Sequence, residues 1–352
     1  MKKKVALVLA VLLALTAVAC GSSDEPEATE ATTTEQTTMT STVETTAQAT
    51  ETTAAETAGP PEEAVLLFPD RYPFAFMINN VAAARPQSGL DKAKLIYQIM
   101  TEGRTTRLLL LTDAEEGIIG PVRSARPAYL DLVAQHQAFY SHAGNYSVVA
   151  ASPVANDIRS LDALEEHYSM YYRTDHRKAP HNLYTKMENA YARAEKTYSK
   201  IAPEEPVAGL YVHNNFVLPD DGEQVTEINY RFASLRESFK YDEEKNVYNK
   251  YNDSSVLVDE QTRENLEVAN IIILHRPHSL MPNNVHNKID WIDENVAATY
   301  LTGGRKYDIT WEKSSHTDPI IYYLNGEELV INPGLTWIVV VDDRALNSVE
   351  YK

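Results

Sequence analysis

Short apolar runs separated by polar turns open the folded part of the chain and are typical of β-strands. The first three runs occupy residues 74–78, 95–100 and 107–111. Residues 125–137 then place apolar side chains at helical spacing, and residues 183–196, with several alanines, have a helical pattern as well. We therefore predict a mixed α/β domain over residues 64–202.

The second half of the chain consists of short runs rich in β-branched and aromatic residues. These runs occupy residues 268–274, 296–301, 307–311, 319–324 and 336–341. Asn325-Gly326 is a strong hairpin signal, because both central residues of a type I′ turn have positive φ, and Gly303-Gly304 is a second such turn. We predict a mostly antiparallel β domain over residues 210–352, after a linker that contains Pro203 and Pro206. The predicted fold class is therefore α+β.

The first 19 residues have the parts of an export signal. Three lysines at positions 2–4 precede a 15-residue stretch, Val5 to Ala19, that is apolar except for Thr16. This stretch is shorter than the about 20 residues that span a bilayer. Cys20, the only cysteine, follows small residues as in a lipobox, where the thiol accepts a diacylglycerol group after cleavage. An ordinary cleaved signal with a chance cysteine is the alternative.

The segment from Cys20 to residue 63 is predicted to be a disordered tether. It is rich in Thr, Glu and Ala, and after the cysteine it contains no aromatic residue and no Lys or Arg. Such a composition buries too little apolar surface to offset the entropy of ordering. We expect the tether to hold the folded body at the extracytoplasmic face of a bacterial cell membrane, with the lipid on Cys20 as the anchor.

The charge of the chain limits its partners. The formal net charge is −18 for the whole chain and −11 for residues 64–352. An acidic body does not suit nonspecific binding of nucleic acid, which depends on neutralising phosphates, and it does not suit lying flat on anionic lipid. The predicted partners are therefore the membrane, through the lipid anchor, and cell-wall polymer or wall-synthesis proteins, with no nucleic acid.

Arginine-bearing loops are the best candidates for a binding site on this acidic chain. Arg123 and Arg126 lie where an apolar run enters the predicted helix, and Ser124 is placed to cap that helix. Guanidinium groups beside a helix N-terminus favour an anion. The candidate anion-binding residues are Arg85, Arg104, Arg107, Arg123, Ser124, Arg126, Arg173, Asp175, Arg177, His181 and Asn182. Alternatively, each arginine pairs with a nearby carboxylate such as Asp91, Glu102 or Asp175 and only holds a loop together.

Patterns for metal or nucleophilic chemistry are weaker. His275 and His278 lie three residues apart, but Pro277 makes this a loop, and no cysteine or third ligand is near in the sequence. We expect these histidines to be solvated or packed. The sequence contains no Gly-x-Ser-x-Gly, no His-Glu-x-x-His and no phosphate-binding loop that ends in Gly-Lys-Ser/Thr.

Several of these stretches together resemble the YerB-like family of bacterial lipoproteins, a two-part domain of unknown function. The resemblance covers about residues 70–345 and rests on residues 77–80, 84–90, 102–107, 119–126, 142–144, 177–185, 309–313, 332–334 and 336–338. It implies a location and an architecture but no settled reaction. The chain departs from the family pattern at Gly103-Arg104, Gly144-Asn145 and residues 275–278.

A fainter likeness is to the LytR–CpsA–Psr phosphotransferases, which bind a polyprenyl pyrophosphate through arginines. The candidate residues under that likeness are Arg85, Arg107, Arg123, Arg126 and Arg177, with Asp91 or Glu102 on Mg²⁺. Phosphoryl chemistry needs positive charge positioned in this way. Mg²⁺ is expected only under this likeness, and no other cofactor is expected.

Three functions follow from these patterns. The leading hypothesis is a membrane-anchored envelope module that recognises an anionic wall component, or a wall-synthesis partner, through its arginine loops. The first alternative is a metal-dependent phosphotransferase-like enzyme that acts on a glycan linked to polyprenyl pyrophosphate. The second alternative is a purely structural envelope protein. The sequence does not name catalytic residues for any of them.

Overall fold

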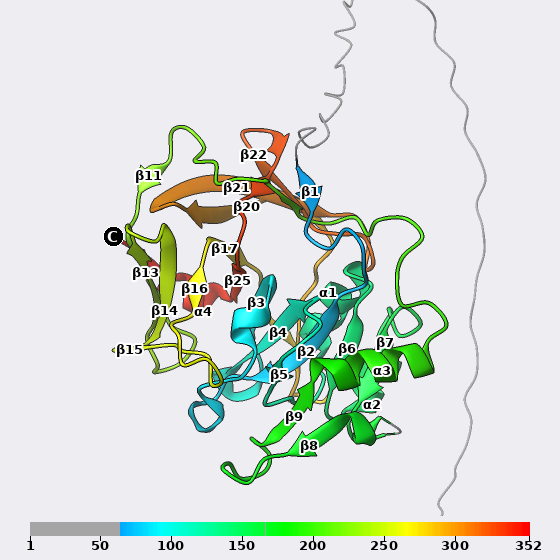
Figure 1. The fold of residues 1–352 in the computed structure, drawn as a ribbon. Helices are drawn as coiled ribbons and strands as arrows, with labels where there is room; N and C mark the ends of the chain where they lie inside the picture. The colour runs from blue at the N-terminus through cyan, green and yellow to red at the C-terminus, as the bar shows by residue number, and fades with distance from the viewer. Residues whose placement is uncertain (1–63, 166) are drawn as a thin grey trace, which may run out of the picture. The chain divides into compact units, whose positions relative to one another are not determined.

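One large sheet runs through the part of the chain that the computed structural model describes, residues 64–165 and 167–352 (Figure 1). Twelve strands of these residues belong to it. Its order is β23-β22-β21-β20-β17-β25-β3-β4-β2-β6-β7, and β11 pairs with β21. The strands are β2 (Phe74–Asn79), β3 (Leu95–Met100), β4 (Thr106–Thr112), β6 (Phe139–His142), β7 (Arg159–Asp162), β11 (Glu223–Gln224), β17 (Asn270–His275), β20 (Asp293–Thr302), β21 (Arg305–Lys313), β22 (Ile321–Leu324), β23 (Glu327–Glu328) and β25 (Thr336–Val341).

The large sheet takes strands from both halves of the sequence. The join is β25, which pairs in parallel with β17 and with β3, so that Ile338 lies opposite Ile272 on one side and Tyr97 on the other. All residues of β2, β3, β4 and β25 are buried. Strands covered on both faces have nearly continuous apolar runs, which is why the sequence shows them so clearly.

Alternate residues of these strands belong to two hydrophobic clusters. Phe76 and Ile78 of β2 pack in the first cluster, together with Trp337. Ala75 and Met77 of the same strand pack in the second cluster. The period of two in a strand sends neighbouring side chains to opposite faces, so the sheet separates two cores.

A smaller sheet packs against the first cluster, to which its residues Ile228, Tyr230 and Phe239 belong. The order of this six-stranded sheet is β15-β14-β13-β12-β26, with β16 paired to β14. Its strands are β12 (Glu227–Tyr230), β13 (Glu237–Asp242), β14 (Val247–Asn252), β15 (Ser255–Val256), β16 (Glu267–Val268) and β26 (Glu350–Tyr351).

Three minor sheets and short helices complete the described part. The minor sheets are β1 (Val65–Leu66) with β10 (Tyr211–Val212) and β24 (Val330–Ile331), β5 (Ile118–Ile119) with β9 (Leu183–Lys186) and β8 (Tyr171–Arg173), and β18 (Ser279–Leu280) with β19 (Asn287–Lys288). The α-helices are α1 (Leu130–Gln135), α2 (Tyr146–Ala150), α3 (Met187–Thr197) and α4 (Asp343–Leu346). The 3₁₀ helices are η1 (Ala82–Ala84), η2 (Leu90–Lys92), η3 (Glu102–Arg104), η4 (Pro127–Tyr129) and η5 (Tyr168–Met170). None of the described helices is long and apolar enough to cross a membrane.

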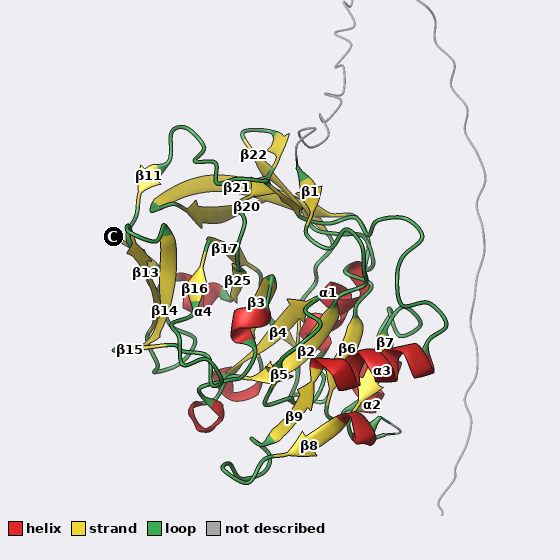
Figure 2. Cartoon of the chain, in the orientation of Figure 1, coloured by secondary structure: helices red, strands yellow, loops and turns green. Residues whose placement is uncertain are grey.

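The described part is mostly β, with several sheets, as Figure 2 shows by its colours. The strands predicted in both halves are confirmed, and Asn325 and Gly326 have the positive φ values, 55° and 86°, of the predicted hairpin. The helices are shorter than predicted. Residues 183–186 pair with β5 and β8 as a strand, and helical structure between residues 125 and 137 is limited to η4 and α1. The predicted signal peptide, Cys20 and the predicted tether lie outside the described residues.

Candidate anion-binding site

Three predicted arginines come together where β2 ends and β4 begins. Asn79, the last residue of β2, is the register partner of Arg107 on β4. The segment that carries Arg123 and Arg126 runs beside the same end of β2, because the Arg123 amide donates a hydrogen bond of 2.8 Å to the Met77 carbonyl. The arginines therefore come from different loops but share one end of the large sheet.

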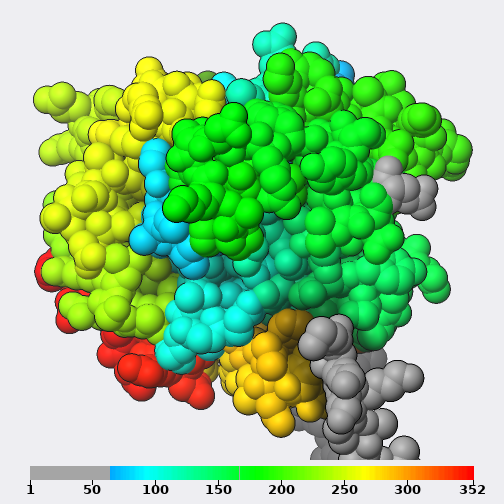
Figure 3. Space-filling view, turned by 90° about the horizontal axis from the view of Figure 1, so that it is seen from below, coloured from blue at the N-terminus to red at the C-terminus, as the bar shows by residue number. Residues whose placement is uncertain are grey.

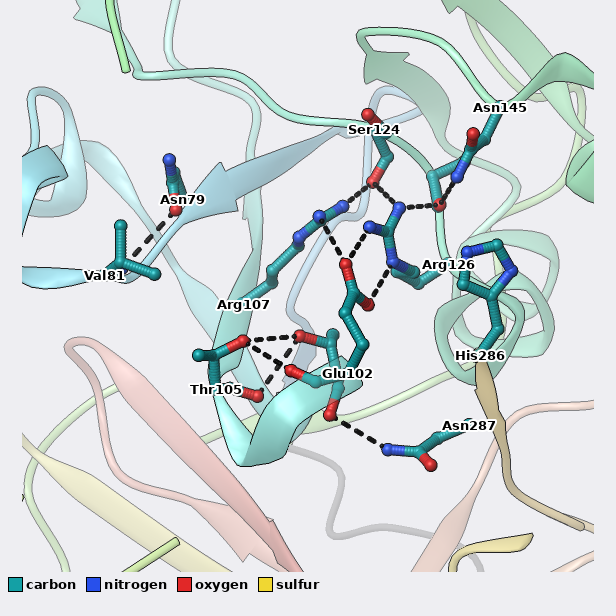
Figure 4. A network of polar contacts seen from close by, with 12 residues as sticks. Asn79, Val81, Glu102, Thr105, Arg107, Ser124, Arg126, Asn145, His286 and Asn287 are labelled. Atoms are coloured by element: carbon teal, nitrogen blue, oxygen red, sulfur yellow. Dashed lines mark hydrogen bonds and ion pairs between the residues drawn. The ribbon is translucent and has the colours of Figure 1, made fainter. Parts of the chain in front are cut away.

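Glu102 on η3 is the anion at the centre of this cluster. Figure 4 shows its carboxylate between the guanidinium groups of Arg107 and Arg126. Arg126 donates to both carboxylate oxygens, with an Nε to Oε2 distance of 2.6 Å, and Arg107 Nη2 lies 3.4 Å from Oε1. Burial alone would raise the pKa of Glu102, but the hydrogen bonds and charge of Arg126 and the charge of Arg107 outweigh it and hold the pKa at about 2. Glu102 is therefore ionised at neutral pH.

The cluster contains more positively charged groups than negatively charged ones. Arg107 is 5% exposed, and burial, reinforced by the charge of Arg126, lowers its pKa to about 10. Arg107 remains a cation at neutral pH. Both it and Arg126 also donate to the Ser124 carbonyl. Arg107 and Arg126 contact the Glu102 carboxylate, and Arg123 is near enough for its pKa to respond to both Arg126 and Glu102. Three guanidinium groups and one carboxylate leave a local excess of positive charge on a body whose formal net charge is −11.

Arg123 differs from the other two arginines in its contacts. Within residues 64–165 and 167–352 it makes no ion pair, and its Nε is buried without a hydrogen-bond partner. Burial lowers the pKa of Arg123, the charge of Arg126 acts in the same direction, and the charge of Glu102 opposes this shift. His181 stands nearby, where burial and the charges of Arg123 and Arg177 lower its pKa. Asn79 Nδ2 lies 2.7 Å from His181 Nδ1, which joins the 173–182 loop to the cluster.

Arg177 belongs to a second network, centred on Glu260. Its Nη2 lies 2.8 Å from the Glu260 carboxylate, which also accepts hydrogen bonds from Ser88 and Tyr184. Arg177 further donates to the carbonyls of Arg85 and Pro86. In Figure 3 the yellow segment around residue 260 lies against the blue and green segments that this network joins. Arg177 therefore holds loops together.

The other predicted residues lie apart from Glu102. Arg104 pairs with Asp342 at 2.7 Å and 3.0 Å, and Arg85 donates to the carbonyl of Asn80 at 2.6 Å. Arg173 donates to Asn182 at 2.8 Å, Asp175 is exposed, and Asp91 pairs with Lys92 at 3.3 Å. In the described part of the chain, no group of three or more His, Cys, Asp or Glu side chains could hold a metal ion. Binding of Mg²⁺ by Asp91 or Glu102 stays a prediction.

Two family models match this chain. Residues 59–200 match the model described as "Protein of unknown function (DUF3048) N-terminal domain", and residues 226–338 match the model for its C-terminal domain. The chain belongs to the YerB-like family. The two matches fall on either side of the predicted linker at residues 203–209.

A protein and a crystal structure from Bacillus subtilis are similar to this chain, in agreement with this family membership. The protein named "Putative lipoprotein YerB" of strain 168 is 26% identical over 284 residues, which make up 80% of this chain and 84% of that protein. The crystal structure of the YerB protein from Bacillus subtilis matches with a TM-score of 0.70 and 24% identity, and covers 80% of this chain and 94% of that chain. The structural likeness shows that the fold is shared.

The predicted role of Ser124 as a helix N-cap is wrong. Helix α1 begins at Leu130, after the 3₁₀ turn η4 that Pro127 opens, and neither has a side-chain cap. Proline is favoured at the first turn of a helix, and the turn starts at Pro127, two residues after the predicted start at residue 125. Ser124 takes part in the cluster through its carbonyl, which Arg107 and Arg126 share.

Two further residues of the cluster come from the second half of the chain. Asn287 Nδ2 donates to the Thr101 carbonyl at 3.0 Å, beside η3. His286 lies next to Arg126 (Figure 4), and its pKa is lowered by burial and by the charge of Arg126. Neither residue belongs to a motif that indicates a site. Their place depends on the hairpin of β18 and β19, which reaches the cluster from a sequence separation of more than 150 residues.

Proposed function

We propose that the chain is a membrane-anchored lipoprotein of the bacterial cell envelope that binds an anionic wall component at Arg107, Arg123 and Arg126. The name of the Bacillus subtilis relative supports the lipoprotein assignment, as does the export signal that ends at Cys20. The anchor would hold the body on the extracytoplasmic face of the membrane.

The buried Nε of Arg123, which has no hydrogen-bond partner in the described part of the chain, is the observation that carries the proposed binding site. A buried donor without a partner costs about 1–3 kcal/mol, and more when the group is charged. Its Nε is such a donor, and the neighbouring arginines are already engaged with Glu102. A phosphate or carboxylate ligand would satisfy this donor and would offset the repulsion among the three guanidinium groups, because charge-assisted hydrogen bonds are the strong ones.

Arg123→Gln is expected to weaken binding of isolated anionic wall polymer by about 10–100-fold, because hydrogen bonds to charged groups contribute about 1.5–3 kcal/mol. The measurement is the dissociation constant of the full chain in phosphatidylcholine nanodiscs. Arg344→Gln is the matched control, since Arg344 is an exposed arginine on α4 and lies outside the cluster. Equal affinity of the Arg123→Gln variant and the unchanged chain would remove this site from the proposal.

Glu102→Gln is expected to act in the opposite direction and to strengthen binding of the same polymer about fivefold. The Glu102 carboxylate occupies the guanidinium groups that a ligand would contact. A ligand that no longer has to displace this carboxylate would gain roughly 1 kcal/mol of binding free energy, which corresponds to this factor. The thermal midpoint of the variant is measured in parallel, because Arg107 and Arg126 lose their partner. Weaker binding by a variant that is still folded would show that Glu102 organises the site and does not compete with the ligand.

A further inference from the structure

A wide groove lies beside the arginine cluster. Its volume is about 820 Å³, within the range of sites for small molecules. The segments around it are η4, α1, α2 and the hairpin of β18 and β19. Its lining residues are Pro127, Leu130, Asp131, Ser147, Val148, Ala151, Ser152, Pro153, Met281, Pro282, Asn283, His286, Lys288, Ile289, Asp290, Ile292 and His316.

The groove borders the cluster, although Arg107, Arg123 and Arg126 are not among its lining residues. Pro127 lines the groove and directly follows Arg126 in the chain. His286 also lines the groove, and its ring stands beside Arg126 (Figure 4). The hydrogen bond from Asn287 to the Thr101 carbonyl fixes the hairpin against η3. A ligand that reaches the guanidinium groups therefore has the groove within reach of its other end.

The groove offers an apolar surface that the chain itself does not cover. Val148 and Met281, which are half-buried, and Ile292, which is exposed, present apolar surface in the groove, whereas Leu130 and Ile289 in its lining are buried. Ile292 is 41% exposed, and Leu280 and Val285 of the same hairpin region are 56% and 51% exposed. Two acidic residues, Asp131 and Asp290, also line the groove, and Asp131 Oδ2 lies 2.7 Å from His316 Nδ1. Apolar exposure of this kind marks an interaction surface.

We infer that the groove holds the hydrocarbon chain of a membrane lipid phosphate whose head group binds Arg107, Arg123 and Arg126. The inference rests on the proposed anion site and names the class of its ligand. Charge complementarity selects this occupant: an excess of guanidinium groups at one end and an apolar channel at the other fit an amphiphilic anion. His286 lies between the two parts and would contact the linkage between head and chain.

Three probes separate the head group from the chain: dodecyl phosphate below its micellar concentration, inorganic phosphate and dodecanol. They are titrated against the full chain in phosphatidylcholine nanodiscs. Dodecyl phosphate is expected to bind about 30-fold or more tightly than inorganic phosphate, since each buried methylene adds to the affinity. Dodecanol is expected to bind much more weakly than dodecyl phosphate, because it lacks the charged head.

Two substitutions locate the chain of the ligand. Ile292→Gln is expected to lower the affinity for dodecyl phosphate about fivefold and to leave the affinity for inorganic phosphate unchanged. Leu346→Gln is the matched control, because Leu346 is 40% exposed and lies on α4, outside the groove. Arg123→Gln is expected to lower the affinity for both dodecyl phosphate and inorganic phosphate.

The outcomes distinguish the inference from the function on which it rests. Equal affinities for dodecyl phosphate and inorganic phosphate, with both lost in Arg123→Gln, would overturn the inference and keep the anion site. The groove would then belong to another occupant, such as a polypeptide segment or a second copy of the chain. Binding of dodecyl phosphate and dodecanol alike, with no effect of Arg123→Gln, would overturn both.

Discussion

Lys250→Ala is expected to lower the free energy of unfolding by about 3–5 kcal/mol, because it leaves a buried carboxylate without its cation. Lys250 Nζ lies 2.8 Å from Glu237, and their side chains are 1% and 4% exposed. Burial lowers the pKa of Lys250, and the charge of Glu237 opposes this shift. The attraction between the two charges offsets much of the cost of burying them, so each residue needs the other to remain charged in the core.

The pair belongs to a polar network between the two sheets. Gln98 of β3 donates to the Glu237 carboxylate at 2.8 Å, and its own Oε1 accepts from Trp337 at 3.0 Å and from Tyr230 at 2.9 Å. The ammonium group of Lys250 also lies 5.0–5.8 Å from the ring centroids of Phe239, Tyr230 and Trp337. Removing one member therefore disturbs the contact between β3, β25 and the smaller sheet.

Urea denaturation of Lys250→Ala measures the predicted cost. An exposed pair supplies the control: Lys245 and Glu267 form an ion pair whose side chains are 59% and 41% exposed, so Lys245→Ala should change stability little. The double variant Lys250→Met with Glu237→Leu should recover much of the loss, because a buried ion pair can be replaced by apolar side chains at small cost. Equal effects of Lys250→Ala and Lys245→Ala would refute the dependence.

The central strands were predictable because a strand that is buried on both faces consists mostly of apolar residues, which form a visible run in the sequence. The strands β2, β3, β4 and β25 have both faces covered, so nearly every residue is apolar or small. The parallel join of β25 to β3 was not predictable in this way. Residues 95–99 meet residues 336–340 across a separation of about 240 residues, and nothing in either run specifies its partner.

The helices were overestimated because apolar spacing is not unique to helices. Residues 183–186 pair with two other strands, and that tertiary pairing overrides their local preference. Gln137, with a φ of 47°, ends the helical segment before β6 begins at Phe139. Pairing with distant strands is invisible to a pattern read along the chain.

The arginine cluster was predicted in part. Arg107, Arg123 and Arg126 stand out because cations are scarce, and the ends of β2 and β4 bring them together. Arg104 and Arg177 have the same signal in the sequence but bind Asp342 and Glu260. Which arginine finds a carboxylate depends on segments that lie 80 or more residues away, so the sequence alone cannot separate the two kinds.

His136 is expected to make the protein lose stability as the pH falls below 6.5. It is 5% exposed, and its Nε2 lies 2.9 Å from the Tyr97 hydroxyl. Burial, reinforced by the charge of Lys313, lowers its pKa from 6.5 to about 3. The unfolded chain therefore binds a proton below pH 6.5 that the folded protein does not bind until about pH 3. The stability that neutral His136 contributes is complete above pH 6.5 and falls by about 1.4 kcal/mol per pH unit toward pH 3.

Urea denaturation at pH 7.5, 6.5, 5.5 and 4.5 measures this slope, and His136→Gln is expected to remove about 2–3 kcal/mol of the loss between pH 6.5 and 4.5. Tyr97→Phe is the matched control, because it removes the hydrogen bond to His136 without removing the imidazole, and should lower stability by a similar amount at every pH. His142, fully buried and with its pKa lowered by burial, leaves some slope in the variant. General charge repulsion acts in the opposite direction, because the chain approaches its isoelectric point near pH 5.0 and loses net charge. A loss of stability in this range must therefore come from specific buried groups, and an identical slope in His136→Gln would assign it to groups other than His136.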